Sequence, residues 1–413
     1  MKRLFAALGL FCALPLQAQI TLEEYRHDVV EYSYSLKAAA ARTVAAAETL
    51  GQARTGYLPR LSMEGDFSLT ARRYDGIERW NFSLQPQIVQ TIYGGGALRA
   101  QVDRAGVGYD IALCEEEFSR LDVRYAADYA YWSLSASRFY AAAMQRYVGI
   151  IVSLKAVIDR RFVEGYIAKG DVLMIDARLS EARYEQVAAE QSADVALHNF
   201  NILRGADPAA EVVLTGGIRD SLPLPARMTV AEAVERRPDY SAARLRSEQA
   251  GADIRIARAS FNPRLNVGVG GAWKPYMPNR TGATILDGSL FVGLSVPIFH
   301  WGERRHAVAA ARARQLESEW GAAGLYDEIV RSEMNGWTAV VQGRAQVDAT
   351  EHSLSIASEN LDISTYSYGE GLATILDVLQ AQLSWIQLYT NSIRARYNYA
   401  VAISDYARIT AGE

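Results

Sequence analysis

Two aspartates stand in matching local sequences and could act through their charge. Asp171 and Asp377 each follow an aromatic-x-Glu-Gly sequence, nine residues after its aromatic residue, which is Phe162 in the first case and Tyr368 in the second. Glycine supplies the positive φ of a tight reversal, so each aspartate should begin a new helix. A carboxylate there complements the helix macrodipole, which stabilises a helix by about 0.3–1 kcal/mol.

The other titratable patterns do not form a reaction centre. His300-x-x-Glu303-x-x-His306 has metal-ligating residue types, but it crosses a predicted strand-to-helix junction and lacks one continuous helical face. The remaining histidines are scattered, and the sequence has no His-Glu-x-x-His, phosphate loop or Gly-x-Ser-x-Gly. We therefore expect no catalytic residue, no cofactor and no metal, and hence no enzyme.

Composition and the first residues place the chain outside the cytoplasm. The chain has 413 residues, a net charge of −4 and no basic footprint for nucleic acid. Residues 1–18 have a basic start, a short apolar stretch and a small-residue exit, which predicts a signal peptide cleaved after Ala18. After cleavage Cys114 stands alone, so no intrachain disulfide can form.

The two halves of the sequence repeat each other. The segment 56–61, Gly-Tyr-Leu-Pro-Arg-Leu, is echoed at 260–265 by Ser-Phe-Asn-Pro-Arg-Leu, and the two aspartate motifs have identical spacing. We interpret this as a duplication, with a first repeat at 19–215 and a second at 216–413.

Each half carries two segments of strict apolar-polar alternation. In the first of them Leu61, Met63 and Phe67 alternate with Ser62 and Glu64. Period two predicts strands with one apolar and one polar face, at about 59–73, 79–92, 263–274 and 285–299. Their length suits tilted membrane strands of about 9–11 residues. Four strands cannot close a barrel, because single-chain barrels start at about 8, so membrane insertion would require an oligomer.

Long helical patterns follow each strand pair. Residues 97–160 and 303–367 contain no proline, and shorter partners follow near 171–204 and 372–410. Unbroken, each long run would reach roughly 95 Å at about 1.5 Å per residue. The reversals between long and short helices lie at one end and the strands at the other, which describes a long tube.

These features resemble the TolC-like outer-membrane efflux proteins. The resemblance rests on the signal peptide, the doubled aromatic-x-Glu-Gly…Asp-Val-Leu motif and the strand exit Val296-Pro297-Ile298-Phe299-x-x-Gly302. It implies an α+β membrane protein that forms a homotrimer. Three chains would close a 12-stranded barrel in the lipid of the outer membrane and continue as an α-helical tunnel in the periplasm. The implied partners are a periplasmic adaptor and an inner-membrane pump, either RND-type or ABC-type.

The resemblance also assigns roles to the reversal segments. It implies a gate formed by Asp377, Tyr368, Asp171 and Gln380, with Tyr368 hydrogen-bonding a neighbouring tip through Asp171. Gln380 stands where some relatives have a second acid, so a doubled acidic ring is not expected. The adaptor-docking tips would comprise Glu164, Gly165, Lys169, Glu370, Gly371 and Ala373.

Two alternatives to a drug or metabolite efflux channel stay open. One is the outer-membrane channel of a type I protein secretion system, which this sequence does not separate from an efflux channel. The other is a periplasmic coiled-coil adaptor, against which the four alternating strands argue.

Overall fold

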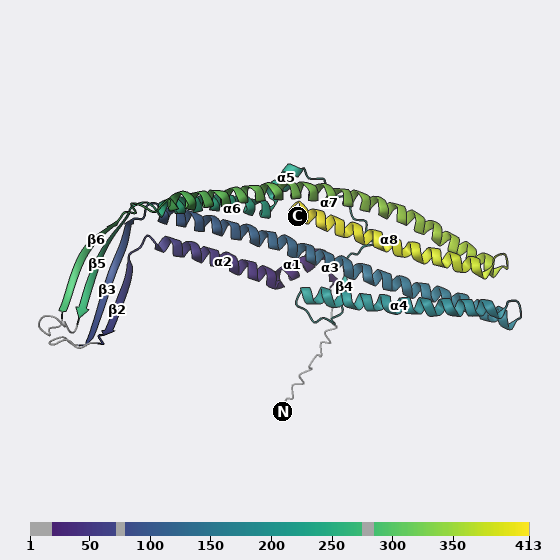
Figure 1. Cartoon of the computed structure of the whole chain (residues 1–413). Coiled ribbons are helices and arrows are strands. Elements are labelled where there is room, and N and C mark those ends of the chain that lie inside the picture. The colour runs from purple at the N-terminus through teal and green to yellow at the C-terminus, as the bar shows by residue number, and fades with distance from the viewer. Residues whose placement is uncertain (1–18, 72–78, 275–284, 413) are drawn as a thin grey trace, which may run out of the picture. The chain divides into compact units, whose positions relative to one another are not determined.

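Four long helices dominate the structure (Figure 1). In the computed structural model, which describes residues 19–71, 79–274 and 285–412, α3 (Ala97–Val163) and α7 (Glu303–Gly369) each have 67 residues. Their partners α4 (Lys169–Leu203) and α8 (Ile375–Ile409) each have 35 residues. No proline interrupts any of the four, so the backbone ladder continues unbroken. The predicted signal peptide at 1–18 lies outside the described residues.

Shorter helices precede each strand pair. Before the first strand pair lie α1 (Leu22–Tyr32) and α2 (Tyr34–Thr55), which are separate helices because Ser33 between them adopts a non-helical conformation. In the second half, α5 (Val230–Arg236) is followed by α6 (Pro238–Ala259), which begins with a proline at its first position. Proline suits that position since its missing N–H would have no helical partner there.

Four antiparallel strands form one sheet in the order β2-β3-β5-β6. They are β2 (Arg60–Leu69), β3 (Trp80–Tyr93), β5 (Arg264–Lys274) and β6 (Ile285–Ser295). The predicted mixture of long helices and a few strands is confirmed. A second sheet pairs only β1 (Gln19–Ile20) with β4 (Val213–Leu214), in parallel.

Two predicted strands are longer than the observed ones. The strand predicted at 285–299 ends at Ser295, because Pro297 has no N–H for the ladder and restricts the residue before it. The strand predicted at 59–73 ends at Leu69. There the Thr70 N–H still donates to the Arg79 carbonyl at 2.6 Å, and the Arg79 guanidinium donates to the carbonyls of Thr70 and Ala71 at 3.2 and 3.3 Å. Residues 72–73 of the predicted strand lie outside the described residues.

The register gives the sheet one apolar and one polar face. Apolar residues pair with apolar residues across neighbouring strands, as in Leu61↔Ile88, Phe67↔Phe82 and Val267↔Val292. The apolar face is exposed in this chain, with Leu290 at 75% and Leu286 at 84% exposure. Phe291 is an exception on the polar face, where its ring covers the position that a Cβ of Gly268 would occupy.

The chain folds into two compact units, each drawing segments from both halves of the sequence. One unit comprises residues 1–36, 119–236 and 329–413, and the other comprises 37–118 and 237–328. The sheet belongs to the second unit, and the paired ends of the long helices belong to the first.

The first unit holds two large apolar clusters. One lies between the paired ends of the long helices and includes Ile158, Ile175 and Val378, each fully buried. The other is centred on Tyr25, whose ring stacks on Phe200 at 3.8 Å between centroids. Within the described residues α3 alone contains a stretch long and apolar enough to cross a membrane, a criterion that core helices also meet.

Candidate gate at the helical hairpin tips

Two helical hairpins end in the same turn. The N–H groups of three successive turn residues donate back into the preceding helix, at 2.9–3.0 Å for residues 164–166 and 2.8–3.1 Å for residues 370–372. Gly165 and Gly371 occupy equivalent places in these turns, with φ of +79° and +78°. A side chain at this φ would be strained, which explains both glycines.

Asp377 forms a capping box at the start of α8. Its carboxylate accepts hydrogen bonds from the Thr374 backbone N–H at 2.8 Å and from the Thr374 hydroxyl at 2.7 Å. In return its own N–H donates to the Thr374 hydroxyl oxygen at 3.3 Å. These hydrogen bonds lower the pKa of Asp377 below its ordinary value. Within one chain this exposed carboxylate is therefore an ionised helix-terminal group.

Asp171 lies at the equivalent place in α4 without a capping box. The residue before that helix is Ala168, whose backbone has almost the same conformation as Thr374 but whose side chain carries no oxygen. The Asp171 N–H donates to the Ala168 carbonyl at 3.1 Å. The two hairpins thus share a backbone turn but differ in how each aspartate is held.

Arg161 joins the two tips. Its guanidinium donates to the Gly369 carbonyl at 2.7 Å and lies 4.7 Å from the centroid of the Tyr368 ring. Such an arrangement is a cation–π contact. Burial raises the pKa of Tyr368, opposed by the positive charge of Arg161. The end of α7 is therefore bound to the end of α3 inside one chain.

The Tyr368 hydroxyl is buried and has no hydrogen-bond partner among the described residues. A bond from this hydroxyl to a neighbouring tip through Asp171 was expected from the family resemblance. Within the described part of one chain that bond is not formed. The ring itself contacts Arg161. The negative charge of Asp171 acts on Tyr368 by raising the pKa of its hydroxyl.

The other predicted tip residues lie mainly at the surface. Glu164, Gly165, Lys169, Glu370, Gly371 and Gln380 are exposed, and Ala373 is half-buried against the apolar cluster. The turns also expose large apolar side chains that the sequence analysis did not single out. Val163 is 86% exposed, Tyr166 78% and Leu372 81%.

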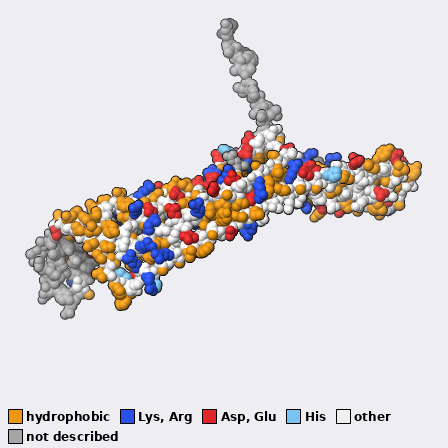
Figure 2. Space-filling model, turned by 90° about the horizontal axis from the view of Figure 1, so that it is seen from above, with side chains coloured by type: hydrophobic (Ala, Val, Ile, Leu, Met, Phe, Trp, Pro, Cys, Tyr) orange, Lys and Arg blue, Asp and Glu red, His pale blue; other side chains and the backbone are white. Residues whose placement is uncertain are grey.

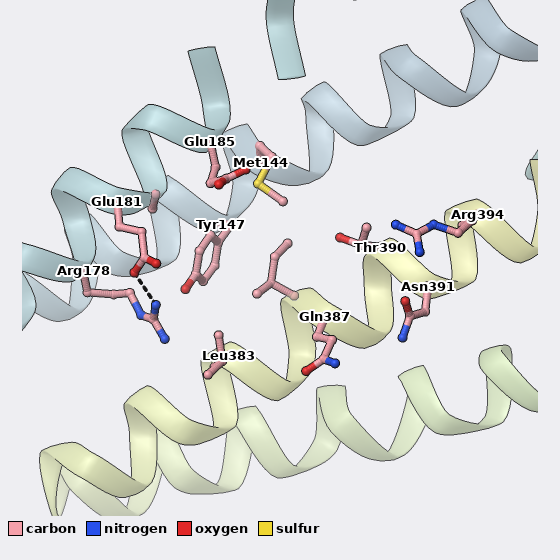
Figure 3. A pocket seen from close by; sticks show the side chains of 12 residues that line it. Met144, Tyr147, Arg178, Glu181, Glu185, Leu383, Gln387, Thr390, Asn391 and Arg394 are labelled. Carbon is pink, nitrogen blue, oxygen red and sulfur yellow. Dashed lines mark hydrogen bonds and ion pairs between the residues drawn. The ribbon is translucent and has the colours of Figure 1, made fainter. Parts of the chain in front are cut away.

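A cavity of about 340 Å³ lies between α3, α4 and α8, away from the turns (Figure 3). Tyr147 points into it, and its buried hydroxyl lacks a partner in the described part of the chain. On α4 the wall carries the ion pair Arg178–Glu181, and on α8 it carries Arg394. The α3–α4 hairpin and α8 are thus not fully packed against each other around this cavity.

Sequence reasoning missed two features of this site. Thr374 and Asp377 form a capping pair at a spacing of three residues, which the sequence shows and which could have been found. Arg161 gave no such signal, because its hydrogen bond to Gly369 spans 208 residues.

Comparison with known proteins identifies the family of this chain, and the matched residues include both hairpin tips. A sequence model of the outer membrane efflux protein family matches residues 25–205 and again residues 229–410. The chain belongs to the outer membrane efflux protein family. The predicted resemblance is confirmed, and with it an outer-membrane efflux channel with a periplasmic helical tunnel.

Individual relatives of this outer membrane efflux protein are distant but cover most of its length. Outer membrane protein TolC of Escherichia coli K12 is 25% identical over 414 residues, covering 93% of this chain and 80% of TolC. Protein CyaE of Bordetella pertussis is 25% identical over 399 residues, covering 88% of this chain and 80% of CyaE. The crystal structure of VceC from Vibrio cholerae matches with a TM-score of 0.79 at 21% identity, covering 95% of this chain and 96% of VceC.

Proposed function

We propose that three copies of this efflux protein close one 12-stranded barrel and serve as the exit duct of a tripartite pump for drugs or metabolites. The observation that carries the proposal is the open sheet. Strands β2 and β6 lie at its two edges, and its apolar face is exposed. Unpaired backbone groups are not tolerated in lipid, so the edges must pair with other copies.

The match of one family model to both halves supports the two-repeat interpretation. The hairpin tips also support two repeats, since each half contributes one hairpin with the same turn. Three chains would then present six hairpins around one mouth, where a periplasmic adaptor would dock. The exposed Val163, Tyr166 and Leu372 give that surface apolar anchors beside the charged Glu164, Lys169 and Glu370.

A matched pair of substitutions on β6 tests the barrel. Leu290 lies on the apolar face and Ser289 on the polar face, next to each other in the strand. Leu290→Arg should cost roughly 2–4 kcal/mol near the bilayer midplane and reduce the trimer in the outer membrane, whereas Ser289→Arg should be tolerated. The measurement is the heat-resistant trimer in membrane fractions on semi-native gels. Equal trimer yields from both variants would contradict the barrel.

A protein-secretion channel is the second candidate. The alkaline protease secretion protein AprF of Pseudomonas aeruginosa is 25% identical over 249 residues, covering 59% of this chain. The sequence similarity to AprF does not separate the two functions, so the identity of the pump decides between them. Crosslinking in cells followed by mass spectrometry of the inner-membrane protein captured with the adaptor is the discriminating experiment. An RND-type partner supports efflux, and an ABC-type partner linked to a secreted protein supports secretion.

A further inference from the structure

The junction between strands and helices is strongly basic in an otherwise acidic chain. It consists of four segments, 54–60, 93–104, 253–264 and 296–306, which we call the arginine collar. The collar contains nine arginines and three carboxylates, whereas the whole chain has a net charge of −4. On the face shown in Figure 2, Lys and Arg side chains gather toward the strand end of the helices. The chain therefore concentrates positive charge at one level.

Three of these arginines surround one cavity. The cavity has a volume of about 570 Å³ and lies between the start of α3 and the end of α6, where Arg99, Arg255 and Arg258 line it. Arg255 is paired with Asp103 at 3.1 Å. The side chains of Arg99 and Arg258 make no hydrogen bond or ion pair in the part of the chain that the structure describes, and both residues are exposed. Two unpaired guanidinium groups thus flank an open, polar hollow.

The position of Arg99 is not explained by a contribution to helix stability. It lies in the first turn of α3, which carries no acidic residue. A cation near a helix N-terminus is unfavourable, because the macrodipole is positive at that end. The arrangement becomes favourable when an anion occupies the hollow between the guanidinium groups. Guanidinium binds phosphate with bidentate geometry, which makes phosphate the fitting anion.

Aromatic residues mark the same level as a membrane boundary. Tyr57, Tyr93, Phe299 and Trp301 belong to the collar and are exposed, Trp301 by 89%. Exposed aromatic side chains gather at the interfaces of membrane barrels. The exposed apolar face of the sheet begins directly beyond them, with Leu61 at 72% and Leu294 at 66% exposure.

We propose that the cavity lined by Arg99, Arg255 and Arg258 binds the phosphate of an anionic phospholipid headgroup in the periplasmic leaflet of the outer membrane. The proposal rests on the proposed function, because the barrel brings the collar to the headgroups. Arg99 and Arg258 supply the unpaired charges, and the aromatic residues hold the chain at that depth. The site would fix the height and tilt of each chain in the leaflet.

Native mass spectrometry of the purified trimer tests the proposal. The trimer is exchanged into mixed micelles that contain phosphatidylglycerol or phosphatidylcholine, and the lipids retained per trimer are counted. The unmodified protein should retain phosphatidylglycerol preferentially. Arg99→Gln with Arg258→Gln should reduce that retention at least fivefold. Arg183→Gln with Arg244→Gln removes the same charge from exposed helix positions outside the collar and should leave retention unchanged.

Inorganic phosphate distinguishes the two sources of the anion. Added at increasing concentration, it should displace phosphatidylglycerol from the unmodified trimer only at high excess, since lipid tails add affinity. Equal retention of both lipids, equal losses from the two double variants, or retention of inorganic phosphate without phosphatidylglycerol would overturn the lipid site. Failure of the barrel itself would appear separately, as absence of the unmodified trimer from outer membranes.

Discussion

Asp377 has an observed role as a helix cap and a proposed role in the gate, and two substitutions can separate them. In one chain it caps α8 through Thr374. In a trimer its three copies would face one mouth, where two unit charges 8 Å apart interact by about 2 kcal/mol at an effective dielectric of about 20. A helix cap acts on stability, whereas a ring of carboxylates acts on permeating ions.

We predict that Asp377→Asn makes the channel less cation-selective and less sensitive to block by divalent ions from the periplasmic side. Reversal potentials and conductance in planar bilayers are the measurements. Thr374→Ala removes the cap but keeps the charge, so it should leave selectivity unchanged. If both variants change selectivity equally, Asp377 is a structural residue and not a gate.

The Asp377 carboxylate should make cation selectivity depend on pH, because the selectivity is lost when the carboxylate gains a proton. The hydrogen bonds from Thr374 lower the pKa of Asp377. It therefore stays ionised at a pH where an ordinary aspartate, with a pKa of about 3.9, would begin to gain a proton. Cation selectivity should persist from pH 7 to about pH 5 and disappear only on further acidification. Loss of selectivity already near pH 6 would show that repulsion within the ring outweighs the cap.

We expect the Tyr368 ring to contribute more to closure of the proposed gate than its hydroxyl does. The hydroxyl has no partner in the described chain, while the ring contacts Arg161. We predict that Arg161→Ala raises the resting conductance several-fold, because it removes both the cation–π contact and the bond to Gly369. Tyr368→Phe should change it little. A large increase in Tyr368→Phe would instead indicate that a neighbouring chain binds the hydroxyl.

Among the helices, the capping box of α8 can be transferred to the equivalent helix α4. Ala168 precedes α4 with φ −81° and ψ 156°, and Thr374 precedes α8 with φ −90° and ψ 162°. We predict that Ala168→Thr completes a capping box with Asp171 and stabilises the start of α4 by about 1 kcal/mol. Hydrogen exchange of peptides at the start of α4 should slow. Ala168→Val adds the same bulk without the hydroxyl and should not slow it.

Helices and strands could be predicted where the sequence pattern that produces them is local. Alternation of Leu61, Met63 and Phe67 with polar residues identified β2, and the absence of proline identified α3 and α7. Strand ends were less predictable, because a single residue such as Pro297 can decide them. The contact between Arg161 and Tyr368 was not predictable, since it depends on how two distant hairpins pack.

At the scale of the molecule, equal helix lengths keep the tips together. Both hairpins pair a helix of 67 residues with one of 35. We predict that removing seven residues from both α7 and α8 moves their tip by roughly 10 Å, at about 1.5 Å per residue, and separates Arg161 from Gly369. Resting conductance in bilayers should rise.

The matched deletion is the control for that experiment. Removing seven residues from each of α3, α4, α7 and α8 shortens both hairpins together, so the tips should stay in contact and the channel should stay closed. A leaky channel from the matched deletion and a closed one from the unmatched deletion would contradict the role of equal helix lengths.

The two unpaired edges of the sheet also have a genetic consequence. The proposed barrel closes only where β2 of one chain pairs with β6 of another, so it depends on every chain in it. When a cell makes normal and edge-damaged copies in equal amounts and they mix freely, about one closed ring in eight contains normal copies alone. Damage at either edge should therefore be dominant, so that an extra plasmid-borne defective copy sensitises a cell that still carries an intact gene.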